Sequence, residues 1–115
     1  MIHKNLEIWK RSMKLVLEVY TLTKEFPSDE KFGLANQMRR AAVSIPSNIA
    51  EGAARKSSKE LKQFLYISIG SLAELDTQIL IAKMLKFISP SSNAIQNEID
   101  EIRAMILSII SKLNQ

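Results

Sequence analysis

Two stripes of side chains, one apolar and one polar, run side by side through residues 34–56. At about 100° per residue, positions three and four apart share one face of a helix. The apolar face consists of Leu34, Met38, Ala41, Ile45, Ile49 and Gly52. The polar stripe beside it consists of Gln37, Arg40, Ser44, Asn48, Glu51 and Arg55. We therefore expect one long helix that buries the first face and carries an ordered row of polar side chains.

The rest of the chain shows the same helical spacing, broken only by short connections. The pattern predicts helices at about residues 5–26, 30–54, 58–88 and 91–113. The last of these keeps coiled-coil spacing at Ile95, Ile99, Ile102, Ile106, Ile109 and Leu113. Four amphipathic helices with short connections predict an all-α fold, an antiparallel up-down-up-down four-helix bundle. A single domain is expected over residues 1–115.

Pro46 lies inside the second predicted helix. Proline has no backbone N–H, and its ring clashes with the preceding turn at a cost of about 3 kcal/mol. Both stripes keep their phase across Pro46, so we favour a kink near residues 43–46 over a break into two helices. We expect the carbonyl that loses its partner to bond Ser44 or Ser47. Gly52 is expected to mark the boundary that follows.

Helix starts are indicated by capping residues. A serine or aspartate before a helix accepts a hydrogen bond from a free backbone N–H, and a glutamate three residues later completes a capping box. The expected starts are Ser28 or Asp29 for the second helix, Ser57 with Glu60 for the third, and Ser89 followed by Pro90, or else Asn93 with Gln96, for the fourth.

The composition excludes most catalytic chemistry. The 115 residues contain no cysteine and one histidine, His3, so thiolate and multi-histidine metal sites are not expected. The acidic residues Glu98, Asp100 and Glu101 are interpreted as a solvated face. We expect no catalytic residues, no metal, no cofactor and no enzyme activity. Without a signal peptide or a membrane span in the sequence, a cytoplasmic protein is expected.

The polar stripe has a counterpart on the third helix, formed by Ser71, Glu74 and Gln78. Antiparallel packing places the two rows at the same level. The expected neighbours are Arg40 with Glu74, Gln37 with Gln78, and Ser44 and Asn48 with Ser68 and Ser71. A hydrogen-bonded network that fixes the helix register is the first interpretation. The alternative is a ligand or catalytic site built from Arg40, Asn48, Glu51 and Glu74.

Positive charge is concentrated in residues 39–62, where six basic residues stand against two acidic ones and supply +4, equal to the net charge of the chain. Basic clusters are typical of phosphate binding, and solubility is the alternative explanation. The predicted nucleic-acid-binding residues are Lys10, Arg11, Lys14, Arg39, Arg55, Lys56, Lys59 and Lys62. No aromatic stacking platform is expected, because Trp9 and Tyr20 lie on an apolar stripe.

The helices carry more apolar surface than one small bundle can bury. On the far side of the second helix, small or apolar residues stand where a monomer would carry charges: Ala35, Val43, Ala50 and Ala54. The first and third helices each have a second apolar face. Self-association is therefore expected.

Residues 39–52, reading RRAAVSIPSNIAEG, and residues 70–79, reading GSLAELDTQI, are preceded by LEIWKRSMKL and KEFPSDEKFGLANQ. Over essentially its full length the chain resembles the bacterial 23S rRNA intervening-sequence protein family. Many members are encoded by intervening sequences within large-subunit rRNA genes, and some are labelled ribosomal proteins. The family motif includes Gln37, Arg40, Ser44, Pro46, Asn48, Glu51, Gly52, Ser71, Glu74 and Gln78.

The resemblance implies a homopentameric ring of four-helix bundles. It also suggests kinship with the accessory variability determinant proteins of retroelements, similar pentamers that bind nucleic acid and a reverse transcriptase through a basic surface. The expected partners are therefore further copies of the chain and RNA or another nucleic acid. The alternative is a protein-interaction scaffold or a reverse-transcriptase accessory protein with no direct RNA specificity.

Overall fold

The computed structural model describes residues 2–30 and 32–115, and within them every regular element is a helix. Four α-helices form the bundle: α1 (Glu7–Thr23), α2 (Leu34–Ala53), α3 (Ser58–Met84) and α4 (Ala94–Leu113). Two short 3-10 helices, η1 (His3–Asn5) and η2 (Ser28–Glu30), precede α1 and α2. The predicted all-α four-helix fold is confirmed.

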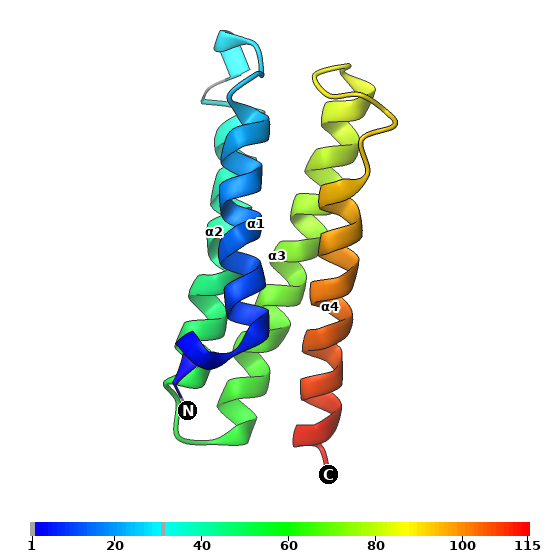
Figure 1. Ribbon diagram of the computed structural model, residues 1–115. Coiled ribbons are helices and arrows are strands. Elements are labelled where there is room, and N and C mark those ends of the chain that lie inside the picture. The colour runs from blue at the N-terminus through cyan, green and yellow to red at the C-terminus, as the bar shows by residue number, and fades with distance from the viewer. Residues whose placement is uncertain (1, 31) are drawn as a thin grey trace.

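Figure 1 shows the chain passing up through α1, down through α2, up through α3 and down through α4. Each helix adjoins its neighbours in sequence, and α1 also adjoins α4, so α1 and α3 lie diagonally across the bundle among the described residues. The bundle measures 45 × 24 × 20 Å. Both termini and the α2–α3 connection lie at the same end (Figure 1).

The apolar stripe of α2 forms the centre of the core, as predicted. Met38, Ile45 and Ile49 are fully buried, and α3 contributes Leu65, Leu72, Leu75 and Ile79 against them. In α4 the expected coiled-coil positions Ile99, Ile102 and Ile106 are buried, but the next buried residue is Ile110, while Ile109 is only half-buried. A straight helix has 3.6 residues per turn, so its buried face drifts away from a strict heptad pattern.

Pro46 lies within α2, which continues unbroken on both sides of it. The alternative of two separate helices is therefore wrong, while the kink stays a prediction. Three side chains donate to consecutive carbonyls just before the proline: Ser47 Oγ to Val43 O at 2.8 Å, Asn48 Nδ2 to Ser44 O at 2.8 Å and Ser68 Oγ to Ile45 O at 3.0 Å. The carbonyl that Pro46 deprives of a partner belongs to Ala42, so Ser47 does not bond the predicted acceptor.

Gly52 is not a turn residue but a buried position in the last turn of α2. A Cβ atom there would lie 2.9 Å from Phe64 Cβ and 3.3 Å from the carbonyl oxygen of Leu61. Glycine at this position therefore allows the end of α2 to approach the start of α3 closely.

The observed start of α2 differs from the prediction, and that of α4 is the second of its two predicted alternatives. Ser57 caps α3 as expected, accepting from Glu60 N at 3.2 Å, although Ser57 Oγ then donates to the Glu60 carboxylate at 3.1 Å. The N-cap of α2 is Gly33 rather than Ser28 or Asp29, and the Glu30 carboxylate accepts from Leu34 N at 3.1 Å. For α4 the N-cap is Asn93, the alternative start, but its side chain makes no capping hydrogen bond and its Oδ1 accepts from Lys83 instead.

The third helix ends at Met84, four residues before the predicted end. Lys86 has a positive φ of 65°, Lys86 N donates to Lys83 O at 3.0 Å, and Phe87 N donates to Ala82 O at 2.9 Å. This pair of bonds is a Schellman motif, which terminates a helix. Phe87 then packs on Phe26, with ring centroids 5.4 Å apart, and closes the upper end of the core.

Candidate functional site

The lower half of the predicted polar network is present between α2 and α3. Ser71 Oγ donates to Ser44 Oγ at 2.9 Å, and Asn48 Nδ2 donates to the same oxygen at 2.9 Å. The buried Ser68 bonds the backbone of α2 at Ile45. The Ser71 and Ser68 bonds join the two helices, as the structural interpretation predicts, whereas the Asn48 bond lies within α2. Glu51 lies outside the network, because its carboxylate accepts from Arg55 at 3.1 Å on the surface.

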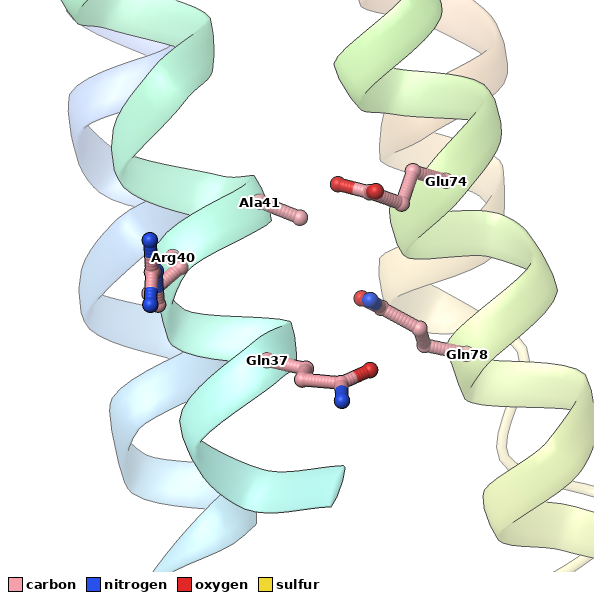
Figure 2. A pocket seen from close by; sticks show the side chains of 5 residues that line it. All are labelled: Gln37, Arg40, Ala41, Glu74 and Gln78. Carbon is pink, nitrogen blue, oxygen red and sulfur yellow. The ribbon is translucent and has the colours of Figure 1, made fainter. Parts of the chain in front are cut away.

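The upper half of the network is open. Among the described residues no hydrogen bond joins Arg40 to Glu74 or Gln37 to Gln78, so the predicted pairs are not formed. Instead these residues and Ala41 line a pocket of about 370 Å³. In Figure 2, Gln37, Glu74 and Gln78 point into the space between the helices, whereas Arg40 lies on another flank of α2.

The geometry of a helix explains why Arg40 points away. Ala41 faces α3, and Gln37, four residues earlier, shares that side of α2. Arg40 is about 100° away from Ala41 around the helix. It therefore lies between the polar pocket and a second hollow, which it lines with Tyr20 of α1 and with Arg39 and other residues of α2.

Gln78 is the most buried polar residue of the pocket, with 7% of its surface exposed. Its Oε1 atom has no hydrogen-bond partner among the described residues and is closed off from solvent. A buried acceptor without a donor costs about 1 to 3 kcal/mol. The pocket therefore contains an acceptor that a suitable donor would stabilise.

The second candidate site is the basic corner, which we define as Arg55, Lys56, Lys59 and Lys62 around the α2–α3 connection. Arg55 is held by Glu51 and lies over the Phe64 ring at 4.8 Å. Lys62 donates to Asn114 Oδ1 at 2.8 Å, which ties the end of α4 to this corner. Lys56 and Lys59 are exposed and have no side-chain partner in the described part of the chain. They are therefore the two cations of the corner available to a ligand.

Tyr66 belongs beside the basic corner, although it was not among the predicted residues. It is 54% exposed. It follows Lys59 by seven positions and Lys62 by four, so the three share one face of α3. That spacing was readable from the sequence, and the expectation that no stacking platform exists did not take Tyr66 into account.

The other predicted cations lie elsewhere. Arg11 donates to both carboxylate oxygens of Glu98, from Nε at 3.0 Å and from a terminal nitrogen at 2.5 Å, and it also pairs with Glu101. The Glu98 side chain is only 19% exposed, so the acidic group is not a freely solvated face. These bonds lower the pKa of Glu98 below its usual value, against the opposing effect of partial burial. They raise the pKa of Arg11 above its usual value.

Arg39 is attached to the end of α1. Its Nε donates to Thr23 Oγ1 at 2.8 Å, and its guanidinium lies 4.6 Å from the centre of the Tyr20 ring. Lys10 pairs with Glu7 at 3.6 Å on the surface, and Lys14 is exposed on α1. The eight predicted cations thus occupy three separate places, of which the basic corner is the densest.

Within residues 2–30 and 32–115, no group of three or more His, Asp or Glu side chains could hold a metal ion. Among the same residues, the helix α3 is long and apolar enough to cross a membrane by length and composition alone, with a mean hydropathy of 1.3 over 18 residues. A core helix of a soluble protein passes the same test, so a single such helix is weak evidence.

A four-helix bundle with a basic corner at one end and a polar pocket between α2 and α3 is the class of protein that these observations define. The chain belongs to the 23S rRNA-intervening sequence protein family, whose family model matches residues 4–108. The resemblance noted in the sequence is thereby confirmed.

The fold is similar to a crystal structure, at 1.70 Å resolution, of a protein with unknown function from the S23 ribosomal protein family of Bacteroides thetaiotaomicron VPI-5482. The TM-score is 0.82 and the sequence identity 23%, with 90% of this chain and 97% of that chain covered. At this identity the likeness concerns the fold. No curated protein matches the sequence.

Proposed function

We propose that this protein is a non-enzymatic bundle that assembles into a homopentamer in the bacterial cytoplasm and binds RNA through its basic corner. The observation that carries the proposal is the placement of the exposed Lys59 and Tyr66 on one face of α3, with the exposed Lys56 beside them in the connection. The family's link to intervening sequences of 23S rRNA makes RNA the first nucleic acid to test.

The residues of the corner suit a single strand. Lysine ammonium groups contact phosphates without reading the sequence. An exposed aromatic ring stacks on an unpaired base, and such stacking contributes about 1 to 3 kcal/mol per base. Tyr66 can offer its ring only to a base that is free of a duplex, so we expect single-stranded RNA to bind more tightly than the same sequence in a duplex.

Salt-dependent binding tests the phosphate contacts. Lys56→Glu with Lys59→Glu should lower the affinity for a single-stranded RNA and reduce the slope of log K against log salt by about 1 or more. Lys24→Glu with Arg103→Glu makes the same charge change at exposed positions away from the corner and serves as the matched control. Equal losses in the two double variants would show that only net charge acts, and would contradict a site at the corner.

Tyr66 separates stacking from charge. Tyr66→Ala should weaken the binding of single-stranded RNA roughly five-fold or more, whereas Tyr66→Phe should retain it, because the ring is what stacks. If neither the wild type nor Tyr66→Phe distinguishes a single strand from a duplex, the stacking role is wrong. If no RNA binds at all, the interaction scaffold becomes the better function, a role that the intramolecular partners of Arg55 and Lys62 favour.

Two exposed apolar faces support self-association. On α1 the face contains Met13, Leu17 and Tyr20, with Leu17 68% exposed. On α3 it contains Leu80, Ile81 and Met84, with Met84 81% exposed. Because α1 and α3 lie diagonally across the bundle, the two faces point to opposite sides. Two different faces meeting head to tail form a ring when the rotation closes, as a pentamer requires.

Charge placed on either face tests this assembly. Leu17→Glu and Met84→Glu should each convert the oligomer to monomers in light scattering. A one-to-one mixture should then form a dimer, because one variant keeps an intact α3 face and the other an intact α1 face. A two-fold symmetric interface uses one face on both copies, so it would leave one of the two variants dimeric on its own. A monomeric wild type at micromolar concentration would contradict self-association.

A further inference from the structure

We propose that the polar pocket between α2 and α3 binds a small guanidinium compound. Nothing in the RNA-binding role requires this pocket, which lies on a different part of the bundle from the basic corner. The pocket has a volume of about 370 Å³ and is lined by Gln37, Arg40 and Ala41 from α2 and by Glu74 and Gln78 from α3. That volume accommodates a molecule of a few heavy atoms.

The side chains that point into the pocket present oxygen acceptors. Figure 2 shows the Glu74 carboxylate and the Gln78 amide directed from α3 towards α2, with the Gln37 amide directed back towards α3. Glu74 has no ion-pair partner among the described residues. The carboxylate therefore gives the pocket a negative charge, and a cation is the complementary ligand.

The buried amide oxygen of Gln78 also favours a ligand in this pocket. The residue is more than nine-tenths buried, and its Oε1 atom has neither a protein donor in the described part of the chain nor access to solvent. A ligand that donates to this oxygen would remove the cost of an unpaired buried acceptor. The gain is available only to a group that carries N–H or O–H donors on its buried side.

The placement of the acceptors favours a guanidinium over an ammonium. They lie on both walls of an open slot, and a planar guanidinium carries five N–H donors on several edges, so it can serve both walls at once. Its flat face can also lie against the small Ala41 side chain. An ammonium has three donors on one nitrogen and would reach fewer of these oxygens.

Arg40 provides a way to test the proposed ligand, because it carries a guanidinium group at the rim of the pocket. Its side chain is exposed and lies on another flank of α2. A change of rotamer would let its guanidinium compete for the pocket. Arg40→Met keeps a side chain of similar length without the charge, so it removes the competitor and leaves every acceptor in place.

The test is a titration of the full-length protein with methylguanidinium, followed through the side-chain amide signals of Gln37 and Gln78 by NMR. We expect both signals to shift saturably in the wild type or in Arg40→Met, with tighter binding in Arg40→Met. Methylammonium is the matched probe of equal charge and should bind at least ten-fold more weakly. Glu74→Gln, which preserves shape, should weaken methylguanidinium binding at least ten-fold.

Three results would overturn the proposal: no saturable shift in either the wild type or Arg40→Met, equal affinity for methylammonium, or full affinity in Glu74→Gln. The first would mean that water alone fills the pocket. The unfolding midpoint of each variant in urea shows that its fold is intact. RNA affinity, measured in parallel, should be unchanged in Glu74→Gln, so the outcome for this pocket is independent of the outcome for the basic corner.

Discussion

Arg11 of α1 donates two hydrogen bonds to the carboxylate of Glu98 of α4, from Nε at 3.0 Å and from a terminal nitrogen at 2.5 Å. The two residues are 87 positions apart, so the pair connects the first helix of the bundle to the last. Charge-assisted bonds in this forked geometry are stronger than neutral ones.

Stability should therefore depend on the ionisation of Glu98. Its pKa is lowered in the folded protein, so the contribution is complete above the unfolded carboxyl value of about 4.3 and is lost as the pH falls through the lower folded value. Glu98→Gln should cost about 1 to 2 kcal/mol at neutral pH and little at low pH. Urea unfolding between about pH 2 and 7 measures this, with the exposed Asp100→Asn as the control. A constant difference between Glu98→Gln and the wild type across that range would refute the assignment.

The two helical glycines Gly52 and Gly70 should respond in opposite directions to alanine. A Cβ at Gly52 would crowd Phe64 and Leu61, whereas a Cβ at Gly70 meets nothing within 4 Å. Gly52→Ala should destabilise the bundle by about 1 to 3 kcal/mol through overpacking. Gly70→Ala should stabilise it by about 0.5 to 1 kcal/mol, because alanine favours the helix. Unfolding midpoints in urea show whether each variant is more or less stable than the wild type. A Gly52→Ala variant as stable as the wild type would show that Phe64 and Leu61 can move to make room for the Cβ.

The protein should be more stable with glycine in place of Lys86. It holds a φ of 65° at the end of α3, a conformation that costs a residue with a Cβ about 1 to 2 kcal/mol. Lys86→Gly should raise the free energy of unfolding by about 1 kcal/mol, and Lys86→Ala, which removes the same charge but keeps the Cβ, should not. Thermal unfolding of the two variants provides the comparison. If Lys86→Gly and Lys86→Ala are equally stable, any gain comes from removing the charge and not from the backbone conformation.

Gln78 should limit stability because of its unpaired oxygen. Gln78→Met has a similar size and no buried acceptor, so it should stabilise the protein by about 1 kcal/mol. Gln78→Glu places a charge at the same point and should destabilise the fold. Chemical unfolding of both variants tests this pair of opposite effects. Destabilisation by methionine would mean that the amide oxygen has a donor in solution.

The buried framework of this protein could be predicted because it depends on local spacing. The stripe containing Met38 and Ile45 has one periodicity and one possible buried face, so both the helix and its core followed from the sequence. Ser57 likewise marks the start of α3 through a contact only three residues long. Such features need no knowledge of distant residues.

Contacts between helices were predicted less well. The prediction placed Arg40 and Glu74 at a similar height along the bundle. Pairing also requires that both side chains point towards each other around their helix axes, and Arg40 lies on another flank of α2. Glu98 was taken for a solvated residue because nothing in α4 itself indicates that Arg11 lies opposite. The end of α3 was missed because its terminating residue is Lys86, whereas glycine is the usual signal.

The three side-chain bonds next to Pro46 have a consequence for how this sequence can vary. Ser68 reaches a main-chain oxygen of α2, and Ser47 and Asn48 hold the two carbonyls before it. The Ser68 bond thus fixes the position of α3 against a backbone oxygen of α2, and every residue type has this atom. Neighbouring core side chains can change size while the Ser68 bond keeps the two helices aligned and the Ser47 and Asn48 bonds hold α2 itself beside the proline.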